Sequence, residues 1–480
     1  MRAAALIVHT ILFAAAAGCS FAPPYTVPDT AKTPPRYKEE PGDWKVAQPQ
    51  DAAPRGTWWT LYGDADLNAL EGKIRDSNLT LKAAFARLQY ARAQYRVARA
   101  DLFPTVTADP YATRQRYSSN APKELPGYPP LLNDFLVGAD FSYEVDLWGR
   151  VRNEVAAARA TRQASAADLA SIELSLRAQL AEDYFNLRAA DAQVSLLDRT
   201  VEDYKKTLGL VTNLFKGGAA ALADVAQAQA QFDNALTQSA DARLQRAQAE
   251  HAIAVLVGEN PSTFSLSVNP LPIAVVPPPI DPGLPSTLLE RRPDIAEAER
   301  RVAGANAQIG VARAAYFPRF TLAATGGFES AHGSNLFDVP SRFWSVGPQV
   351  SLPIFEGGRL VAQTAQAKAT YEEQVADYRN TVLTAYQDVE DNLAALRQLK
   401  AESDTDAEAV KATSTALQQA QDRYDAGIVT FLEVATAETA ALQAQITAVN
   451  IQARRMSASV LLIKALGGGW QAPLAPLSKD

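Results

Sequence analysis

The sequence is poor in the residues that most often carry out catalysis or bind metals. It has one cysteine and three histidines in 480 residues, and the histidines (His9, His251 and His332) lie far apart. A single cysteine excludes an intramolecular disulfide, and no glycine-rich phosphate-binding loop follows a predicted strand. We therefore expect a protein that is not an enzyme, binds no metal or dissociable cofactor, and takes any energy it needs from a partner.

Long apolar runs and an excess of basic residues are also missing. No run of roughly 18 apolar residues follows the N-terminal segment, so no membrane-spanning helix is expected. The 46 Lys and Arg residues are outnumbered by 53 Asp and Glu residues, which gives no electrostatic footprint for nucleic acid. A mean hydropathy of −0.14 is typical of soluble proteins, and equally of β-barrels, whose strands alternate apolar and polar residues.

The first residues have the pattern of an export signal. Arg2 supplies a positive charge, and the stretch from Ala3 to Ala17 is largely apolar. We expect residues 1–18 to be a signal peptide that is removed from the mature protein.

Cys19 follows this segment and indicates a lipid anchor. The string Ala16-Ala17-Gly18-Cys19 resembles a bacterial lipobox, with Ala16 where Leu is most common, and Ser20 fits sorting to the outer membrane. We expect a covalent lipid on Cys19; the alternative is a stray thiol in a removed leader. Residues 19–56, rich in Pro and polar groups, predict an extended arm that would carry this lipid.

The rest of the chain contains two related halves. The string FKGGAAALADVAQA at Phe215 returns as YDAGIVTFLEVATA at Tyr424, an offset of 424 − 215 = 209 residues. The motif ARADLFP (98–104) returns as ARAAYFP (312–318), an offset of 214. A period near 210 is too long for a solenoid repeat, which indicates duplication of a whole substructure. We assign residues 57–260 to the first repeat, 261–285 to a Pro-rich link, 286–470 to the second repeat and 471–480 to a tail.

Each repeat is predicted to contain a helix, a β-hairpin, a long helix and a further helix. Pro104 ends the first helix, and glycines at 217, 218 and 427 mark the turns after the long helices. In the first repeat the predicted helices are 64–101, 149–215 and 222–256, and the hairpin is 104–147. In the second repeat the helices are 287–315, 359–424 and 430–466, and the hairpin is 319–354.

The long helices carry a coiled-coil seam, and each would span about 100 Å at roughly 1.5 Å per residue. The apolar residues of the seam follow steps of three and four. They are Leu187, Ala190, Val194, Leu197, Val201, Tyr204, Leu208, Val211 and Phe215 in the first repeat, and Val375, Tyr378, Val382, Ala385 and Val389 in the second. Such long helices need partners along their whole length, in this chain and in other copies.

The predicted strands alternate strictly between apolar and polar residues, which gives each strand one apolar and one polar face. Lengths of roughly ten residues with aromatic side chains near the ends match strands of an outer-membrane barrel. The alternative is a half-buried sheet of a soluble protein. The residues predicted to face lipid are Phe135, Val137, Phe141, Tyr143, Val145, Phe320, Leu322, Trp344, Val346 and Val350.

Four strands cannot close a barrel in lipid, where open strand edges are not tolerated. The chain must therefore pool its strands with copies of itself. A trimer gives 3 × 4 = 12 strands, an even number within the range of known barrels. We expect a mixed α and β protein, in which a homotrimer shares a 12-stranded transmembrane β-barrel and a long coiled-coil α-helical barrel.

Several motifs make the chain recognisable from residue 19 to residue 470. They are Trp58-Trp59 followed by GDADLNAL, SYEVDLWGRVR (142–152), LLERRPDIAEAERR (288–301), ARAAYFP and LPIFEGGRL (352–360). With these motifs the chain resembles the TolC-like outer-membrane efflux proteins, specifically their NodT-type, OprM-like lipoprotein branch. The resemblance implies a homotrimeric exit duct in the outer membrane for drugs or other small molecules. It also implies a periplasmic adaptor and a proton-driven inner-membrane transporter as partners.

The resemblance further implies a gate at the periplasmic tip, at the turns near 215–225 and 424–434. Asp224 and Tyr424 match family gate positions, whereas a carboxylate common in the family would fall at Thr436 and is missing. Glu433 is a candidate to replace that carboxylate, and Arg423 could pair with either acid. A ring of carboxylates at a constriction favours cations. The alternative is that Asp224 and Glu433 are first-turn acids favoured by the helix dipole.

Two other functions remain open at this stage. Within transport, the chain could be the duct of a type I protein secretion system or of a metal exporter. In a different class, it could be a structural coiled-coil lipoprotein of the envelope without a pore. The export signal and the alternating strands favour an outer-membrane duct over a coiled-coil protein without a pore.

Overall fold

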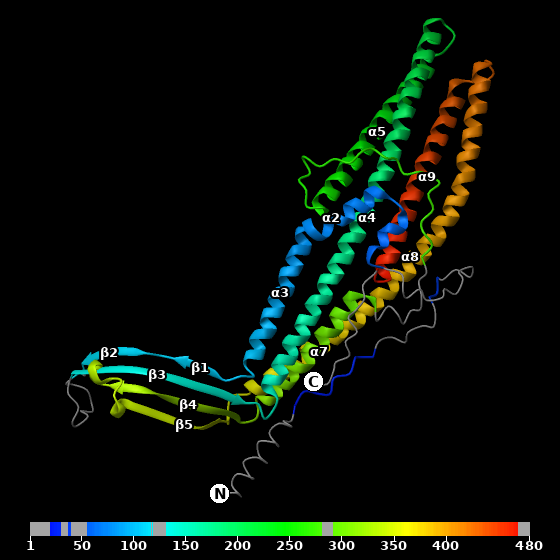
Figure 1. The fold of residues 1–480 in the computed structure, drawn as a ribbon. Helices are drawn as coiled ribbons and strands as arrows, with labels where there is room; N and C mark the ends of the chain where they lie inside the picture. Colours follow the sequence, from blue (N-terminus) through cyan, green and yellow to red (C-terminus); the bar gives the residue numbers. More distant parts are fainter. Residues whose placement is uncertain are drawn as a thin grey trace. The chain divides into compact units, whose positions relative to one another are not determined.

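A computed structural model describes residues 20–29, 37–39, 55–116, 118, 131–280 and 291–468. The predicted signal peptide, Cys19 and the tail 471–480 lie outside these residues. The chain forms two compact units, and each draws on both halves of the sequence (Figure 1). Unit 1 comprises Met1–Asp29, Arg87–Ser165 and Glu297–Tyr378, and unit 2 comprises Thr30–Ala86, Ala166–Ala296 and Arg379–Asp480.

The chain is mostly helical, with one sheet. The elements, in chain order, are η1 (Arg55–Tyr62), α2 (Ala65–Ser77), α3 (Leu79–Ala100), β1 (Thr105–Ala108), β2 (Tyr111–Arg116), β3 (Leu131–Val145), α4 (Arg150–Lys216), α5 (Leu222–Leu256), α7 (Pro293–Ala314), β4 (Arg319–Ser330), η3 (Gly333–Asn335), η4 (Val339–Ser341), β5 (Arg342–Ser351), α8 (Arg359–Asp425) and α9 (Phe431–Ala465). No helix of the described residues is both long and apolar enough to cross a membrane.

Corresponding helices of the two repeats have identical lengths. The helices α4 and α8 each have 67 residues, and α5 and α9 each have 35. All four boundaries keep the offset of 209 seen in the sequence, for example 359 − 150 and 465 − 256. The helices α3 and α7 each have 22 residues at the offset of 214. These equalities support the interpretation of the chain as a duplication.

Two predicted elements are interrupted. The single helix expected over 64–101 is wrong, because Asn78 separates α2 from α3. The Asn78 side chain accepts a hydrogen bond from the Leu81 N–H, 2.9 Å, as an N-cap residue does. The first strand of the hairpin expected over 104–147 is likewise split at Asp109–Pro110 into β1 and β2, since Pro has no N–H to donate.

The sheet of unit 1 is antiparallel, in the order β1-β3-β4-β5, with β2 also paired to β3. The pairs Ala108–Ala139 and Tyr111–Leu136 lie on either side of the Asp109–Pro110 interruption. Their residue numbers have the same sum, so β1 and β2 keep one register on β3. They act as one interrupted edge strand, and the sheet has four strand positions.

Unit 2 has a large apolar core, in which both repeats take part. Its members come from η1 and α2 (Trp58, Leu67, Ile74), α4 (Leu180, Tyr184, Leu187), α5 (Ile253), α8 (Val389, Leu393) and α9 (Met456, Val460, Leu462). Burial of each such side chain stabilises the fold by about 1.5–3 kcal/mol. The seam residues Leu197, Val211, Val382 and Ala385 are also buried, in keeping with coiled-coil packing of the long helices.

Candidate functional sites on the strand face and at the helical tip

All ten residues predicted to face lipid share one face of the sheet. The β3–β4 register pairs Phe141 with Ala324, Tyr143 with Leu322 and Val145 with Phe320. The β4–β5 register continues this face from Ala324 to Val346 and from Phe320 to Val350. Directly paired residues project on the same side of a sheet. None of the ten is buried in the single chain. Half of them are exposed, namely Val137, Leu322, Trp344, Val346 and Val350, and Trp344 is 77% exposed.

The opposite face of the sheet is mostly polar, with Leu136 and Phe343 as apolar exceptions. It carries Asp140, Ser142 and Glu144 of β3, which pair with Thr325, Ala323 and Thr321 of β4. The sheet thus separates an apolar side from a polar side.

A short part of the N-terminal arm packs at the end of the sheet where β3 ends and β4 begins. The Phe21 ring stacks on Phe317 with a centroid distance of 4.4 Å, and Phe317 lies 5.0 Å from the Trp148 ring. The Ser20 hydroxyl donates to Asn153 Oδ1 of α4, 3.2 Å. Cys19 itself is outside the described residues, but its neighbour Ser20 is thereby held against the first turn of α4.

The turn between α4 and α5 contains Asp224, the first gate candidate. The Ala221 N–H donates to Asp224 Oδ2 at 3.1 Å, and the Asp224 N–H donates to the Ala221 carbonyl at 3.1 Å. This is the contact of an acid that closes the first turn of a helix. Asp224 therefore acts as a first-turn acid of α5, which is the structural role considered for it from the sequence.

The turn between α8 and α9 contains the other candidates. Arg423 Nη1 and Glu433 Oε1 form an ion pair of 2.5 Å across this turn, so Glu433, not Asp224, is the acid that Arg423 binds. The Tyr424 ring packs edge-on against Phe431, with centroids 5.8 Å apart. Burial, followed by the nearby charges of Asp224 and Asp425, raises the pKa of Tyr424. The Tyr424 hydroxyl thus stays protonated at physiological pH.

Beneath Tyr424 lies a small apolar cluster that joins the two helix hairpins. Val211 and Ala228 come from α4 and α5, and Phe431 and Val434 come from α9. Thr436, where the resemblance implied a carboxylate, donates its hydroxyl to the Leu432 carbonyl at 2.8 Å. The structure therefore brings Asp224 and Tyr424 to one end of unit 2, together with the pair of Arg423 and Glu433.

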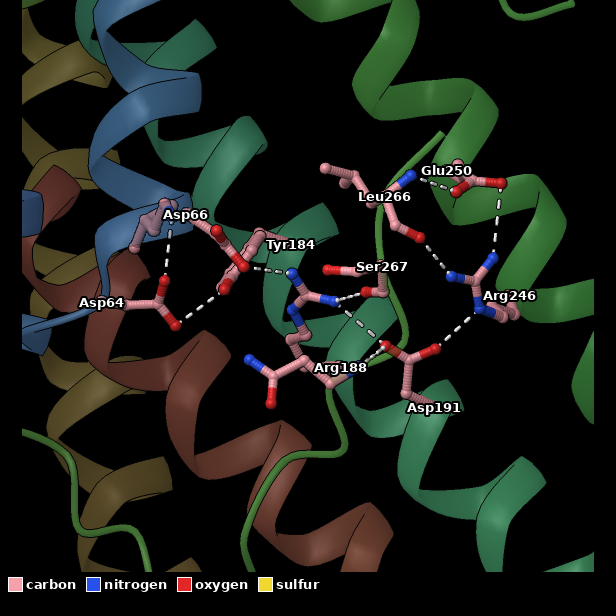
Figure 2. Close-up of polar contacts among 11 residues, drawn as sticks. Asp64, Asp66, Tyr184, Arg188, Asp191, Arg246, Glu250, Leu266 and Ser267 are labelled. Atoms are coloured by element: carbon pink, nitrogen blue, oxygen red, sulfur yellow. Dashed lines mark hydrogen bonds and ion pairs between the residues drawn. The ribbon is translucent and has the colours of Figure 1, made fainter. Parts of the chain in front are cut away.

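Sequence patterns did not predict a buried polar network in unit 2 (Figure 2). Arg188 of α4 is only 2% exposed, and its guanidinium contacts Asp66 Oδ2 at 3.0 Å and Asp191 Oδ2 at 3.1 Å. Arg246 of α5 binds the other oxygen of Asp191, 2.7 Å. Tyr184 donates to Asp64 Oδ2, 2.7 Å, which ties α4 to the start of α2.

The same network holds the extended segment that follows α5. Arg188 Nη1 donates to the Ser267 carbonyl at 2.6 Å, and Arg246 Nη2 donates to the Leu266 carbonyl at 2.8 Å. The Leu266 N–H donates to Glu250 Oε1, 2.7 Å (Figure 2). These charged groups recognise main-chain atoms, so they fix the path of the link between the repeats rather than form an open site.

Sequence patterns also did not predict two buried carboxyl groups of unit 2. Burial raises the pKa of Glu71 to about 8, against the lowering effect of Arg177. Burial raises the pKa of Glu438 in α9 to about 7, with Gln231 opposing this shift and Asp203 adding to it. Within the described part of the chain, no group of three His, Cys, Asp or Glu side chains could hold a metal ion.

Comparison with known proteins shows which family has this architecture. The family model for outer membrane efflux proteins matches residues 70–259 and 284–468. The chain is 33% identical to the outer membrane protein OprJ of Pseudomonas aeruginosa over 98% of its own length and 97% of that protein. It is also 33% identical to the toluene efflux pump outer membrane protein TtgC of Pseudomonas putida, with 94% and 93% of the two chains covered.

Solved structures give the same result. The outer-membrane channel OprN matches with a TM-score of 0.86 and 30% identity, over 95% of this chain and all of that chain. The CmeC outer membrane channel of Campylobacter jejuni matches with a TM-score of 0.85 and 27% identity, over 94% of this chain and 96% of that chain. The chain therefore belongs to the outer membrane efflux protein family, and it is an outer-membrane channel component of a tripartite efflux system.

Proposed function

We propose that the chain is one protomer of a homotrimeric, lipid-anchored exit duct for small molecules. The observation that carries this proposal is the sheet of unit 1, which combines an apolar face that is not buried with two edges that pair with no strand among the described residues. One edge is β1 with β2 and the other is β5. In lipid, unpaired backbone groups cost several kcal/mol each, so both edges must pair with other strands.

Copies of the same chain can supply the missing strands. Neighbouring strands of the sheet alternate in direction, so β5 of one copy runs antiparallel to β1 and β2 of the next. Three copies with four strand positions each give 12 strands, an even number compatible with a closed barrel. The apolar face then meets lipid, and the polar face with Asp140 and Glu144 lines the interior. The seams of the long helices close a helical barrel in the same trimer.

The lipid on Cys19 belongs to this proposal. The stacking of Phe21 on Phe317 and Trp148 holds the arm beside the start of β4. A lipid attached two residues earlier would enter the membrane at the level where the strands begin.

The gate residues define how the duct would close. Asp224 and Glu433 occupy equivalent places in the two repeats, since 433 − 224 = 209, and a trimer would bring six such carboxylates to its tip. Arg423 neutralises Glu433, which leaves Asp224 to set the charge of the constriction and its preference for cations. Opening would separate the hairpins, at the expense of the cluster around Phe431. A periplasmic adaptor and a proton-driven inner-membrane transporter would supply that work and choose the cargo.

Planar-bilayer conductance of the purified protein tests this proposal. The wild-type protein should give small, mostly closed channels, and Asp224→Ala combined with Glu433→Ala should raise the conductance several-fold. The matched control is Asp233→Ala combined with Glu408→Ala, which removes two exposed acids from α5 and α8 away from the turns. Absence of conductance in every variant would exclude a duct.

Two further measurements test the assembly and the anchor. Chemical crosslinking in detergent should yield species of up to three chains; monomers alone would rule out the shared barrel. Metabolic labelling with a radioactive fatty acid should mark the wild type and not Cys19→Ser. Label that persists in the serine variant would contradict a lipid on Cys19.

A further inference from the structure

The two helices that lead into the sheet differ sharply in charge. The sequence of α3 contains Lys82, Arg87, Arg92, Arg96 and Arg99 and no acidic residue. The sequence of α7, its counterpart in the second repeat, contains three acidic and three basic residues. A cationic helix of this kind is unexpected in a chain whose net charge is −7.

One face of α7 is covered by the N-terminal arm. Asn306 Nδ2 donates to the Pro23 carbonyl at 2.9 Å, and Arg313 Nη1 donates to the Phe21 carbonyl at 3.3 Å. Between them, Gly310 leaves room for the arm, because a Cβ there would lie 2.8 Å from the Ala22 Cβ. The three residues thus form a built docking face for an extended segment.

The offset of 214 maps this docking face onto the arginines of α3. Asn306, Gly310 and Arg313 correspond to Arg92, Arg96 and Arg99, which lie on one side of the helix because they are spaced by four and three residues. All three arginines are exposed. In the described part of the chain none of them pairs with an acid, and the Arg99 guanidinium lies 5.9 Å from the centroid of the Tyr95 ring.

The position of these arginines relates them to the membrane. Arg99 comes six residues before the start of β1, as Arg313 comes six residues before the start of β4. Both strands pair with the C-terminal part of β3, so they start at the same end of the sheet. If the sheet lies in the outer membrane, as the proposed function requires, the arginines lie at the headgroups of the periplasmic leaflet.

We propose that Arg92, Arg96 and Arg99 bind the phosphate groups of anionic phospholipids in that leaflet. This inference rests on the proposed function, and it gives the face of α3 a lipid occupant where the face of α7 has the arm. Guanidinium groups suit phosphate, which they bind through paired hydrogen bonds. Phe103, 62% exposed at the same end of α3, offers an apolar contact for the lipid chains.

A second copy of the chain is a poorer match for this face. In the second repeat the arm lies between α7 and Asn153 of α4, and the counterpart of Asn153 is Ala362 of α8 (153 + 209 = 362). Residues 359–370 of α8 contain no acid; Arg359 in this stretch is paired with Glu356, which leaves Lys368 as its other cation. A neighbouring copy that brought this stretch to α3 would therefore not neutralise the arginines, and the next acids along α8, Glu372 and Glu373, lie beyond it.

Lipid retention by the full-length protein tests the proposal. Nanodiscs would contain equal parts of phosphatidylethanolamine and phosphatidylglycerol, and the lipids that remain on the protein after detergent exchange would be quantified by mass spectrometry. The wild type should retain phosphatidylglycerol in excess. In the triple variant Arg92→Gln, Arg96→Gln, Arg99→Gln this excess should fall at least about fivefold, the preference expected from one arginine near an anionic surface.

A charge-matched control separates this effect from net charge. The variant Lys82→Gln, Arg87→Gln, Lys411→Gln also removes three exposed cations and should retain phosphatidylglycerol like the wild type. An unchanged lipid ratio in the arginine variant would overturn the proposal, as would an equal loss in the control. Loss of crosslinked trimers in the arginine variant alone would instead assign the face to a second copy. Conductance, measured on the same samples, reports separately on the proposed duct.

Discussion

The two helix hairpins of this chain share a backbone plan but not the groups that stabilise it. Hairpin 1 (α4 and α5) and hairpin 2 (α8 and α9) match in length residue by residue. In hairpin 1, Arg188 and Asp191 form the buried network that holds the link. Their counterparts in hairpin 2 are Arg397 and Lys400, and Arg397 binds Glu39 of the N-terminal arm. The duplicated site is thus used for two different connecting segments.

The junction at the end of each hairpin shows the same divergence on a smaller scale. Asn78 Nδ2 donates to the Leu256 carbonyl at 2.8 Å in the first repeat. In the second repeat Arg292 Nη1 donates to the Ala465 carbonyl at 3.2 Å, and the two pairs are related by the offsets of 214 and 209. Each satisfies a carbonyl in the last turn of a helix, which lacks a partner within the helix. The backbone leaves this carbonyl without a hydrogen-bond donor, and different side chains can donate to it.

The strongest test of this comparison is removal of the arginine in each hairpin. Arg188→Ala should destabilise the protein by about 3 kcal/mol or more, because it disrupts a buried charge network. Arg397→Ala should cost less than about 1 kcal/mol, since the Arg397 side chain is 44% exposed and its pair with Glu39 is partly screened by solvent. Thermal unfolding in detergent, followed by circular dichroism, measures both. Equal losses would mean that the two networks are equivalent.

The next test compares glycines within one hairpin. Gly258 and Gly218 both have positive φ, +71° and +76°. A Cβ at Gly258 would lie 2.5 Å from the Ser77 carbonyl oxygen, whereas a Cβ at Gly218 would meet nothing within 4 Å. Gly218→Ala should therefore cost about 1 kcal/mol from backbone strain alone, and Gly258→Ala about 2–3 kcal/mol.

Gly467→Ala repeats this measurement in hairpin 2. A Cβ there would lie 2.8 Å from the Arg291 carbonyl oxygen, so its cost should match that of Gly258→Ala. A cost like that of Gly218→Ala would show that the second junction yields more easily than the first.

A third test uses pH. Glu438 is 7% exposed and lies near Gln231 of α5 and near Asp203 and Tyr204 of α4. Burial and the charge of Asp203 raise its pKa, whereas the hydrogen bond with Gln231 lowers it. Its pKa is raised to about 7 from 4.5, so the folded state binds the proton more tightly than the unfolded state. The stability that this tighter proton binding contributes is greatest below about pH 4.5 and is lost as the pH rises through 7. Between pH 5 and pH 8 the free energy of unfolding of the wild type should therefore fall by about 2 kcal/mol more than that of Glu438→Gln.

The counterpart of Glu438 in hairpin 1 is Gln229, which is exposed and binds Asp233. Gln229→Glu should therefore leave the pH dependence of unfolding unchanged. If both variants gave the same profile as the wild type, the burial of Glu438 would have no effect on stability.

The smallest effect is expected at the tip. Arg423 and Glu433 are about half exposed, so a double-mutant cycle with Arg423→Ala and Glu433→Ala should give a coupling free energy of about 0.2–1 kcal/mol. The pair has no equivalent in hairpin 1, where Leu214 stands in place of Arg423. A coupling above about 2 kcal/mol would indicate that the pair is held more rigidly than its exposure implies.

Local sequence signals account for most of the fold. Pro104, the glycine turns and the duplicated motifs located the long helices to within one or two residues. The break at Asn78 was missed because it involves neither Pro nor Gly, although Asn is a favoured N-cap residue. Alternation in the strands was sufficient to assign all ten residues of the apolar face to the same side.

Contacts between distant segments could not be predicted in this way. Asp191 and Arg246 are 55 residues apart on different helices, and no local pattern links them. The docking of Phe21 on Phe317 joins residues almost 300 positions apart, and only the fold brings them together. At the tip, the sequence left the partner of Arg423 open between Asp224 and Glu433, and the structure pairs it with Glu433.

The interruption at Asp109–Pro110 has a consequence for a chain that has not yet met its partners. It divides the outer edge of the sheet into segments of four and six residues, β1 and β2, and gives that edge a position with no N–H. Short, proline-containing edges are poor templates for accidental pairing with other chains. A newly exported chain would thus be protected against aggregation at the same edge that, in the proposed trimer, pairs with a neighbouring copy.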